Sequence, residues 1–525
     1  MSTESSSSFG QVTFGLNGRS VSVPADGANL LEALRDRLGV RSPKDGCSPQ
    51  GQCGCCTVWV DGQPRVACVT PVARVAGREI TTVEGVPAAA EWAQRLCASG
   101  GSQCGFCTPG IIMRLAALDA PQGTDDGVRQ ALLAHLCRCT GWQTVVEAAC
   151  SPGDALAPDT PARDTTARDT PARDTTAAAR RATLEGRSAQ LVSPEVALGL
   201  GGFAADSAPL DALVAVRAAD GSWVVADTLT EARRAAGKVQ GRRTTEPMRW
   251  PIDVPPGDWV RTLQTTWVEP AYLEPDAAWS TPGGEPVHAL TNGGAFGGKV
   301  HSEVGAVARR LADHHQRTVL AVYSREDVVR FGPKRPPMAG GVNADGTGVL
   351  RVARTPGIAA AIAAVAPGLV VEEVDVPGPP TSSSLRGAGW AEALVLLAPA
   401  DGWVTAPNGA RAHALVRDDG SVQVTVQCGP PLDDVVLRSY CIGAAHMALG
   451  WVRSEGLTVN APGEPLDLTI RSFGVLRAVD TPRIDVVVEP GTGEPVNGSD
   501  AVFAAVALAA WRAEGFAPRW PTMRA

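Results

Sequence analysis

The chain has 525 residues, of which 44% are hydrophobic and 19% charged, and its net charge is −8. This composition is typical of a globular protein of several domains and excludes a disordered chain. The acidic balance gives no basis for binding nucleic acid or an anionic membrane. We expect a soluble, cytoplasmic protein, because the sequence has neither a secretory signal at its start nor an apolar run long enough to span a bilayer.

The first predicted domain covers residues 9–83 and is rich in strands. Val12 to Leu16 alternates like a strand, and Asn17-Gly18 is typical of a hairpin turn before a return strand. Asn29 is placed to cap a helix that runs to Leu38. A further strand is predicted from Val58 to Val60.

A cysteine-rich loop interrupts this domain. Eleven of the thirteen cysteines lie between Cys47 and Cys150, and clustered cysteines without a secretion signal indicate metal binding rather than disulfides. The first group has the spacing C-x5-C-x2-C, one residue longer than the plant-type [2Fe–2S] spacing, so we expect a bulge at residues 48–52. The predicted iron ligands are Cys47, Cys53, Cys56 and Cys68. Cys55, between two of them, is interpreted as a packed residue.

The second predicted domain, residues 84–152, is helical. Short helices are expected at 88–98, 109–118, 127–136 and 142–150, with cysteine pairs at their joints. These pairs predict a second four-thiolate site made by Cys104, Cys107, Cys137 and Cys139. Cys97 and Cys150 are assigned to the core. Zinc is the alternative metal, since paired cysteines also form four-cysteine zinc sites.

The remainder of the chain predicts a linker and a large mixed domain. Residues 153–185 contain a near-repeat of Asp-Thr-Pro-Ala-Arg-Asp-Thr-Thr-Ala, whose polar composition favours a flexible linker. Residues 186–525 mix strand patterns, such as 213–216 and 484–488, with helix patterns, such as 304–315 and 501–513. The chain as a whole is therefore predicted to be an α+β multidomain protein.

The two cysteine motifs resemble a known module. Gln-Cys-Gly-Phe-Cys-Thr-Pro-Gly at 103–110, followed by Leu-Cys-Arg-Cys-Thr-Gly at 136–141, is similar to the iron–sulfur module of the molybdenum hydroxylases, the xanthine dehydrogenase and aldehyde oxidase family. The resemblance implies a β-grasp ferredoxin domain, a four-helix domain and two [2Fe–2S] clusters. It also places Gln103 at the position whose side chain faces molybdopterin.

The C-terminal part resembles a shortened molybdopterin-binding subunit of that family. The segments PAYLEP at 270–275, GGAFGGK at 293–299, LRGAG at 385–389 and GTGEP at 491–495 occur in family order. The resemblance implies that Gly294, Phe296 and Gly297 approach a molybdenum cofactor, that Arg386 helps to hold substrate and that Glu494 is the catalytic base. Val268 stands where the family has glutamine, and the region has about half the family's length.

The function implied by the resemblance is electron transfer within an oxidoreductase. Electrons would pass from a molybdenum centre through the second cluster and then the first to an acceptor. FAD is not expected on this chain, so a partner with FAD or another acceptor is expected, together with a companion full-length molybdopterin-binding subunit and a small-molecule substrate. The alternative is a non-catalytic assembly or interaction subunit whose molybdopterin domain has decayed.

Overall fold

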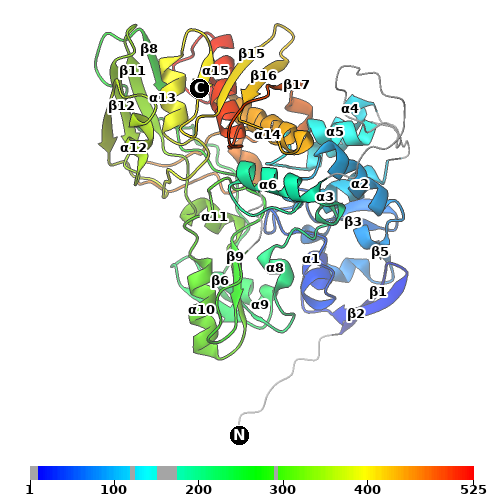
Figure 1. Cartoon of the computed structure of the whole chain (residues 1–525). Coiled ribbons are helices and arrows are strands. Elements are labelled where there is room, and N and C mark those ends of the chain that lie inside the picture. The colour runs from blue at the N-terminus through cyan, green and yellow to red at the C-terminus, as the bar shows by residue number, and fades with distance from the viewer. Residues whose placement is uncertain (1–9, 119–123, 151–173, 289–293, 525) are drawn as a thin grey trace, which may run out of the picture.

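The computed structural model describes residues 10–118, 124–150, 174–288 and 294–524. Its strands form one five-stranded sheet and three four-stranded sheets, with helices between and around them. In Figure 1 the cysteine-rich N-terminal third lies on the right, and the C-terminal sheets and helices extend across the top from the left to the centre. The predicted mixture of helices and strands in several units is thus observed.

The first sheet has the strand order β2-β1-β5-β3-β4 and contains the predicted hairpin. Asn17 and Gly18 adopt the left-handed conformation, which joins β1 to β2 in a two-residue turn. The Asn29 side chain accepts a hydrogen bond from the Glu32 amide and caps α1 (Leu30–Glu32), which continues as the π-helix η1 (Ala33–Arg37). The strands are β1 (Gln11–Leu16), β2 (Arg19–Pro24), β3 (Thr57–Val60), β4 (Gln63–Val66) and β5 (Glu79–Thr81).

Four short helices follow, close to their predicted positions: α2 (Ala89–Ser99), α3 (Thr108–Leu115), α4 (Asp125–Ala131) and α5 (Gln143–Cys150). Their buried side chains join those of the first sheet in one hydrophobic cluster, which includes Phe14 and Trp142. The same cluster contains Trp267 and Phe473 from the C-terminal part. The cysteine-rich N-terminal third therefore shares its core with the rest of the chain.

The predicted linker is shorter than expected at its C-terminal side. Residues 151–173 lie outside the described residues, but α6 (Thr175–Gly186) is a helix, so the prediction of a flexible segment up to residue 185 is wrong for this stretch. Asp174 caps the helix, and Arg181 is fully buried, where it pairs with Glu185 and donates to the carbonyl oxygens of Pro430 and Pro431. These distant partners explain why a polar sequence is ordered here.

A small sheet of order β7-β6-β10-β9 occupies the middle of the chain. The helix α10 (Val304–His315) covers one of its faces. The short helix α8 (Ala204–Ser207) packs against its edge strand β9, and α9 (Leu229–Ala235) packs against β6 and β7 (Figure 1). The helix α7 (Pro194–Ala197) packs instead against α2 of the N-terminal third. The strands are β6 (Leu213–Arg217), β7 (Trp223–Ala226), β9 (Ala277–Ser280) and β10 (Val319–Val322).

Two further sheets, of order β13-β12-β11-β8 and β14-β15-β16-β17, complete the fold. Their strands are β8 (Arg261–Gln264), β11 (Met338–Val342), β12 (Gly348–Ala353), β13 (Leu369–Val374), β14 (Trp403–Thr405), β15 (Arg411–Val416), β16 (Val422–Gln427) and β17 (Ile484–Val488). The accompanying helices are α11 (Arg325–Phe331), α12 (Ile358–Ala363), α13 (Trp390–Leu397), α14 (Asp434–Arg453) and α15 (Ser499–Ala513).

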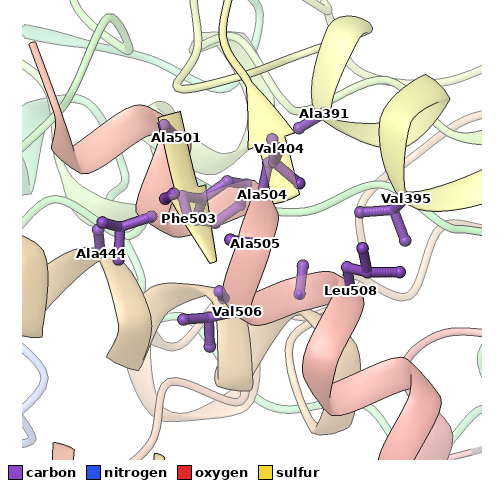
Figure 2. Packing of buried hydrophobic residues seen from close by; sticks show 14 of the residues in the cluster. Ala391, Val395, Val404, Ala444, Ala501, Phe503, Ala504, Ala505, Val506 and Leu508 are labelled. Atoms are coloured by element: carbon purple, nitrogen blue, oxygen red, sulfur yellow. The ribbon is translucent and has the colours of Figure 1, made fainter. Parts of the chain in front are cut away.

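The helix α15 forms the centre of the C-terminal core. Figure 2 shows its side chains, among them Phe503 and Leu508, packed between α13, α14 and β14. Among the described residues, α14 is the one helix whose length and apolar character would suit a membrane span, and 89% of its most apolar window is buried in the protein. The helix α14 is therefore a helix of the protein core.

Candidate iron–sulfur centres

The first group of predicted ligands converges in the structure. Cys47, Cys53 and Cys56 lie on the loop between η1 and β3, and Cys68 lies just after β4. All four are buried, with at most 3% of each residue exposed. The thiol of Cys47 contacts those of Cys53 and Cys68, and the thiol of Cys68 contacts that of Cys56. Each of the four sulfur atoms therefore contacts at least one other sulfur atom of the group.

The longer loop before Cys53 points its backbone amides at a sulfur. The amides of Gln50 and Gln52 donate to the Cys47 Sγ over 3.2 and 3.4 Å. Hydrogen bonds from the neighbouring thiols, and then from these amides, hold the pKa of Cys47 well below its ordinary value, which favours the thiolate that binds metal. The Gln50 side chain also bonds Glu326 and the Ile470 amide, so this loop is attached to the C-terminal part.

The second group converges in the same way. Cys104 and Cys107 precede α3, while Cys137 and Cys139 precede α5. The Sγ atoms of Cys104 and Cys139 are 3.5 Å apart, and the Cys137 thiol contacts those of Cys107 and Cys139. Hydrogen bonds from these neighbouring thiols hold the pKa of Cys137 well below its ordinary value.

The two groups pack against each other through small residues. A Cβ added to Gly110 of α3 would lie 2.3 Å from the Gly54 carbonyl oxygen, so the helix touches the first loop directly. The ring of His135 lies between them, with its Nε2 3.1 Å from the Gly110 oxygen and 3.4 Å from Thr57 Oγ1. Burial lowers the pKa of His135 to about 4, so the ring is neutral. Cys55 is fully buried here, which agrees with its interpretation as a packed residue.

The remaining cysteines lie elsewhere. Cys428 and Cys441 are buried in the C-terminal core, with 1% and 0% exposed. Cys97 and Cys150, assigned to the core, are half-buried, and Cys150 packs against the cluster of the N-terminal third.

Two of the C-terminal motifs, GGAFGGK and LRGAG, also meet, beside the second cysteine group. A Cβ on Gly294 would lie 2.6 Å from the Cys139 Sγ, and one on Gly297 would lie 1.9 Å from the Ser384 oxygen. The guanidinium of Arg386 lies 3.8 Å from the centre of the Phe296 ring. Sequence patterns about 90 residues apart therefore form one local structure.

A family model, known protein sequences and solved structures all match this chain. A family model described as a [2Fe-2S] binding domain matches residues 82–150. A protein of Bacillus subtilis (strain 168) named as a probable xanthine dehydrogenase subunit is 35% identical over 143 residues, which cover 26% of this chain and 80% of that protein. The chain belongs to the molybdenum hydroxylase family.

Proteins named as xanthine dehydrogenases and aldehyde oxidases match over a similar length of this chain. The xanthine dehydrogenase of Blastobotrys adeninivorans is 36% identical over 159 residues, and aldehyde oxidase 1 of Oryctolagus cuniculus is 38% identical over 135 residues. These matches cover 26% and 23% of this chain, and only 11% and 10% of the respective relatives. The chain thus spans about a tenth of the length of these curated relatives.

Solved structures resemble the whole chain. The aldehyde oxidoreductases of Desulfovibrio desulfuricans ATCC 27774 and Desulfovibrio gigas superpose with TM-scores of 0.64 and 0.65. Each comparison covers 95% of this chain and 97% of the other at 15% identity. A likeness at this identity establishes a shared mixed α/β multidomain fold.

The cysteine groups fit the iron–sulfur clusters that this family implies. Each group offers four buried, adjacent thiols, and backbone amides point at Cys47 and Cys137, as the sulfurs of a cluster require. Four thiols also suit tetrahedral zinc, and the match to a [2Fe-2S] binding model favours iron for the second group. When bound, a [2Fe–2S] cluster takes up and releases single electrons.

In contrast, the described residues of the C-terminal part do not fit a molybdopterin. The Gln103 side chain, expected to face a pterin, donates instead to the Cys139 oxygen over 3.1 Å and to Ser439 Oγ of α14 over 2.9 Å. The cavity beside Phe296 and Arg386 has a volume of about 40 Å³, which suits one or two water molecules.

The charged groups around this cavity are already paired. Arg386 binds Asp500 and Ser499 over 2.9 and 3.0 Å, and is 3% exposed. The other pairs are Arg138 with Glu455, Arg335 with Glu392 and Lys334 with Glu269. Each charged residue described in the lining is thus engaged in an ion pair within this chain, and we derive no chemistry through a pterin here.

Glu494 lies away from the cavity. Its side chain is 90% exposed on the loop between β17 and α15, 3.7 Å from Arg180, and it does not line the pocket of Arg386. The structure therefore brings Arg386, Phe296 and the loop glycines together but leaves the predicted base outside. Its catalytic role stays a prediction.

Sequence reasoning missed two buried carboxylates that line the cavity, Glu269 and Glu455. Glu269 follows Val268 directly, lines the cavity and is fully buried against Lys334. Glu269 directly precedes the PAYLEP segment, and this position beside a recognised motif was the signal available in the sequence.

Proposed function

We propose that this chain is the iron–sulfur electron-transfer component of a molybdenum hydroxylase-type oxidoreductase. Two [2Fe–2S] clusters are held by Cys47, Cys53, Cys56 and Cys68 and by Cys104, Cys107, Cys137 and Cys139. The observation that carries the proposal is the convergence of eight buried thiols into two groups that contact each other through Gly54 and Gly110.

The direction of transfer follows from what surrounds each group. The second group contacts the motif loop at Gly294, on the side where the family holds its molybdenum cofactor, so it receives electrons. The first group lies farther from that loop and passes them to the acceptor. Because the cavity of this chain does not fit a pterin, the molybdenum centre is assigned to a partner subunit, and the C-terminal part acts as the scaffold that covers both clusters.

Metal and sulfide analysis tests this function. The chain, purified anaerobically, is expected to contain about four iron and four acid-labile sulfide atoms, as two [2Fe–2S] clusters require. Little or no molybdenum or pterin is expected in the chain alone. Electron paramagnetic resonance of the reduced protein should show two distinct signals.

The contrary results are equally clear. Stoichiometric zinc without sulfide would refute the clusters. Molybdenum with pterin in the isolated chain would refute the assignment of that centre to a partner and would support catalysis by this chain itself.

A further inference from the structure

A chamber of about 530 Å³ lies beside the first cysteine group, between two walls from distant parts of the chain. One wall is the face of α1 and η1, and the other is the face of the small sheet β7-β6-β10-β9. Figure 1 shows these elements facing each other, with α8 and α9 between them. The volume is in the range of pockets that bind small organic molecules.

Polar contacts at two sides fix the distance between the walls. On the side of α8, Arg35 forms an ion pair of 2.7 Å with Asp206, to which Lys44 is also bound. On the side of α9, the Thr230 amide donates to Glu32 over 3.1 Å. Also from α9, Arg233 donates to Asp45 over 3.1 Å and to Ser48 over 2.9 Å. The chamber is therefore preformed and does not depend on a ligand to open it.

The sheet wall is apolar where β6 and β10 line the chamber. Residues alternate along a strand, so Leu213, Ala215 and Ala321 pack against α10 on the far face. Their neighbours Val214, Leu320 and Val322 point to the chamber and remain half-buried. This aliphatic surface suits the face of a planar ring system.

The charges of the lining exclude an anionic occupant. Eight acidic residues and four arginines line the chamber. The arginines are engaged by this chain's own carboxylates, as in the pairs Arg35–Asp206, Arg37–Asp26 and Arg41–Asp36. A ligand bearing phosphate groups would meet excess negative charge, so a neutral molecule is favoured.

The chamber reaches the loop that carries the first cluster. Asp45 and Ser48, on either side of Gly46-Cys47, belong to its lining, as does Phe106. A Cβ on Gly46 would lie 3.2 Å from the Phe106 ring and 3.0 Å from the Cys53 Sγ, so the ring and the thiol contact the same glycine. An occupant is thus separated from the cluster ligands by one layer of residues.

We propose that this chamber binds a neutral, planar electron acceptor of the quinone class, which the first cluster reduces. The proposal rests on the electron-transfer function above. Two single electrons, delivered one after the other from substrate oxidation on the partner subunit, and two protons convert the two carbonyl groups of the quinone into the two hydroxyl groups of the hydroquinone.

Carboxylic acids in the lining can supply the protons. Burial raises the pKa of Glu274 to about 7, and burial also raises the pKa values of Glu32 and Asp36. Glu274 faces Lys299, Glu32 faces Thr230 and Arg37, and Asp36 faces Arg41. Protonated acids also lower the negative charge that an uncharged ring system meets.

The test uses the full chain loaded with its clusters and the naphthoquinone menadione as the probe. Binding is measured by isothermal titration calorimetry on the oxidised protein. Leu320→Trp, which fills the chamber from β10, is expected to weaken binding about tenfold or more. Val322→Trp serves as the second variant should Leu320→Trp fail to fold. Leu415→Trp, at an exposed leucine of β15, is the matched control and should bind menadione like the wild type.

A second readout follows the electrons. Dithionite-reduced protein, freed of excess reductant, should be reoxidised by menadione, as seen by recovery of visible absorbance, and Leu320→Trp should slow this step in proportion to its loss of binding. Flavin mononucleotide, which carries a phosphate, should bind much more weakly than menadione.

Three results would overturn the proposal: no menadione binding to iron-loaded wild type, equal binding by wild type and Leu320→Trp, or flavin mononucleotide binding as tightly as menadione. Each of these presupposes iron-loaded protein. A preparation without iron would instead refute the proposed function, so the two failures are distinguishable.

Discussion

The N-terminal third and the C-terminal part use their family motifs in opposite ways. In the N-terminal third the motif side chains meet one another, so that eight thiols form two groups with sulfur atoms in contact. In the C-terminal part a motif side chain is bound by a residue outside the motifs, as when Arg386 of LRGAG pairs with Asp500 over 2.9 Å. A motif can therefore persist for its chemistry or for its packing, and only the partners of its side chains tell which.

The largest effect is expected when one of the proposed cluster ligands of the N-terminal third is removed. Cys107→Ser should abolish one of two paramagnetic signals and lower the iron content from about four to about two atoms per chain, because a cluster needs all four thiolates. Iron analysis and electron paramagnetic resonance measure this. Cys428→Ser removes an equally buried cysteine of the C-terminal core and should leave both signals unchanged. Full iron content in Cys107→Ser would refute its role as a ligand.

The next effect concerns stability in the C-terminal part. Glu269→Met leaves the fully buried Lys334 without its partner and should lower the free energy of unfolding by about 3–5 kcal/mol. The double variant Glu269→Met/Lys334→Met should recover most of this loss, and urea unfolding measures both. Asp375→Asn, in the exposed pair with Arg354, should have no measurable effect. Comparable losses in the single and double variants would contradict a structural ion pair.

A third prediction uses pH. Burial raises the pKa of Glu274 from 4.5 to about 7, so between these values the folded chain binds more protons than the unfolded chain. Stability should therefore fall as pH rises from 4.5 to 7, by up to about 3 kcal/mol, and level off above that range. Glu274→Gln should flatten this part of the profile. Glu285→Gln, at a side chain that is 96% exposed, should not.

The smallest expected effect is that of Glu494→Gln. Since its carboxylate is 90% exposed and lies outside the cavity, iron content, stability and turnover of the assembled enzyme should all match the wild type. Steady-state kinetics with the partner subunits measure the turnover. A complete loss of turnover with intact clusters would restore the base predicted from the sequence and would narrow the contrast between the two regions.

Local spacing made the cysteine groups and the elements around them predictable. Asn17-Gly18 and the cap at Asn29 act on neighbouring residues, and the cysteine pairs bracket short helices, so sequence and structure agree there. The ends of the linker were not predictable, because Arg181 of α6 is ordered by carbonyl groups about 250 residues away.

The bonding partners of the motif residues expected to face molybdopterin were also not predictable from the sequence. Arg386 binds Asp500, which lies 114 residues farther along the chain, and Gln103 binds Ser439 of α14. The motifs themselves gave no sign of these distant partners. Motif letters specify which groups are present, but only the folded chain specifies what each group is bonded to.

The attachment of the N-terminal third to the scaffold has a consequence for how such proteins can be assembled. The contacts across this boundary include the bidentate bond of Arg138 to Glu455 over 2.6 and 2.7 Å and the Gln143 bonds to Ile484, none of which uses the peptide segment between residues 150 and 174. Two separately expressed polypeptides divided within that segment should therefore recombine. The main consequence of joining the two parts in one chain is then that they are made in equal amounts.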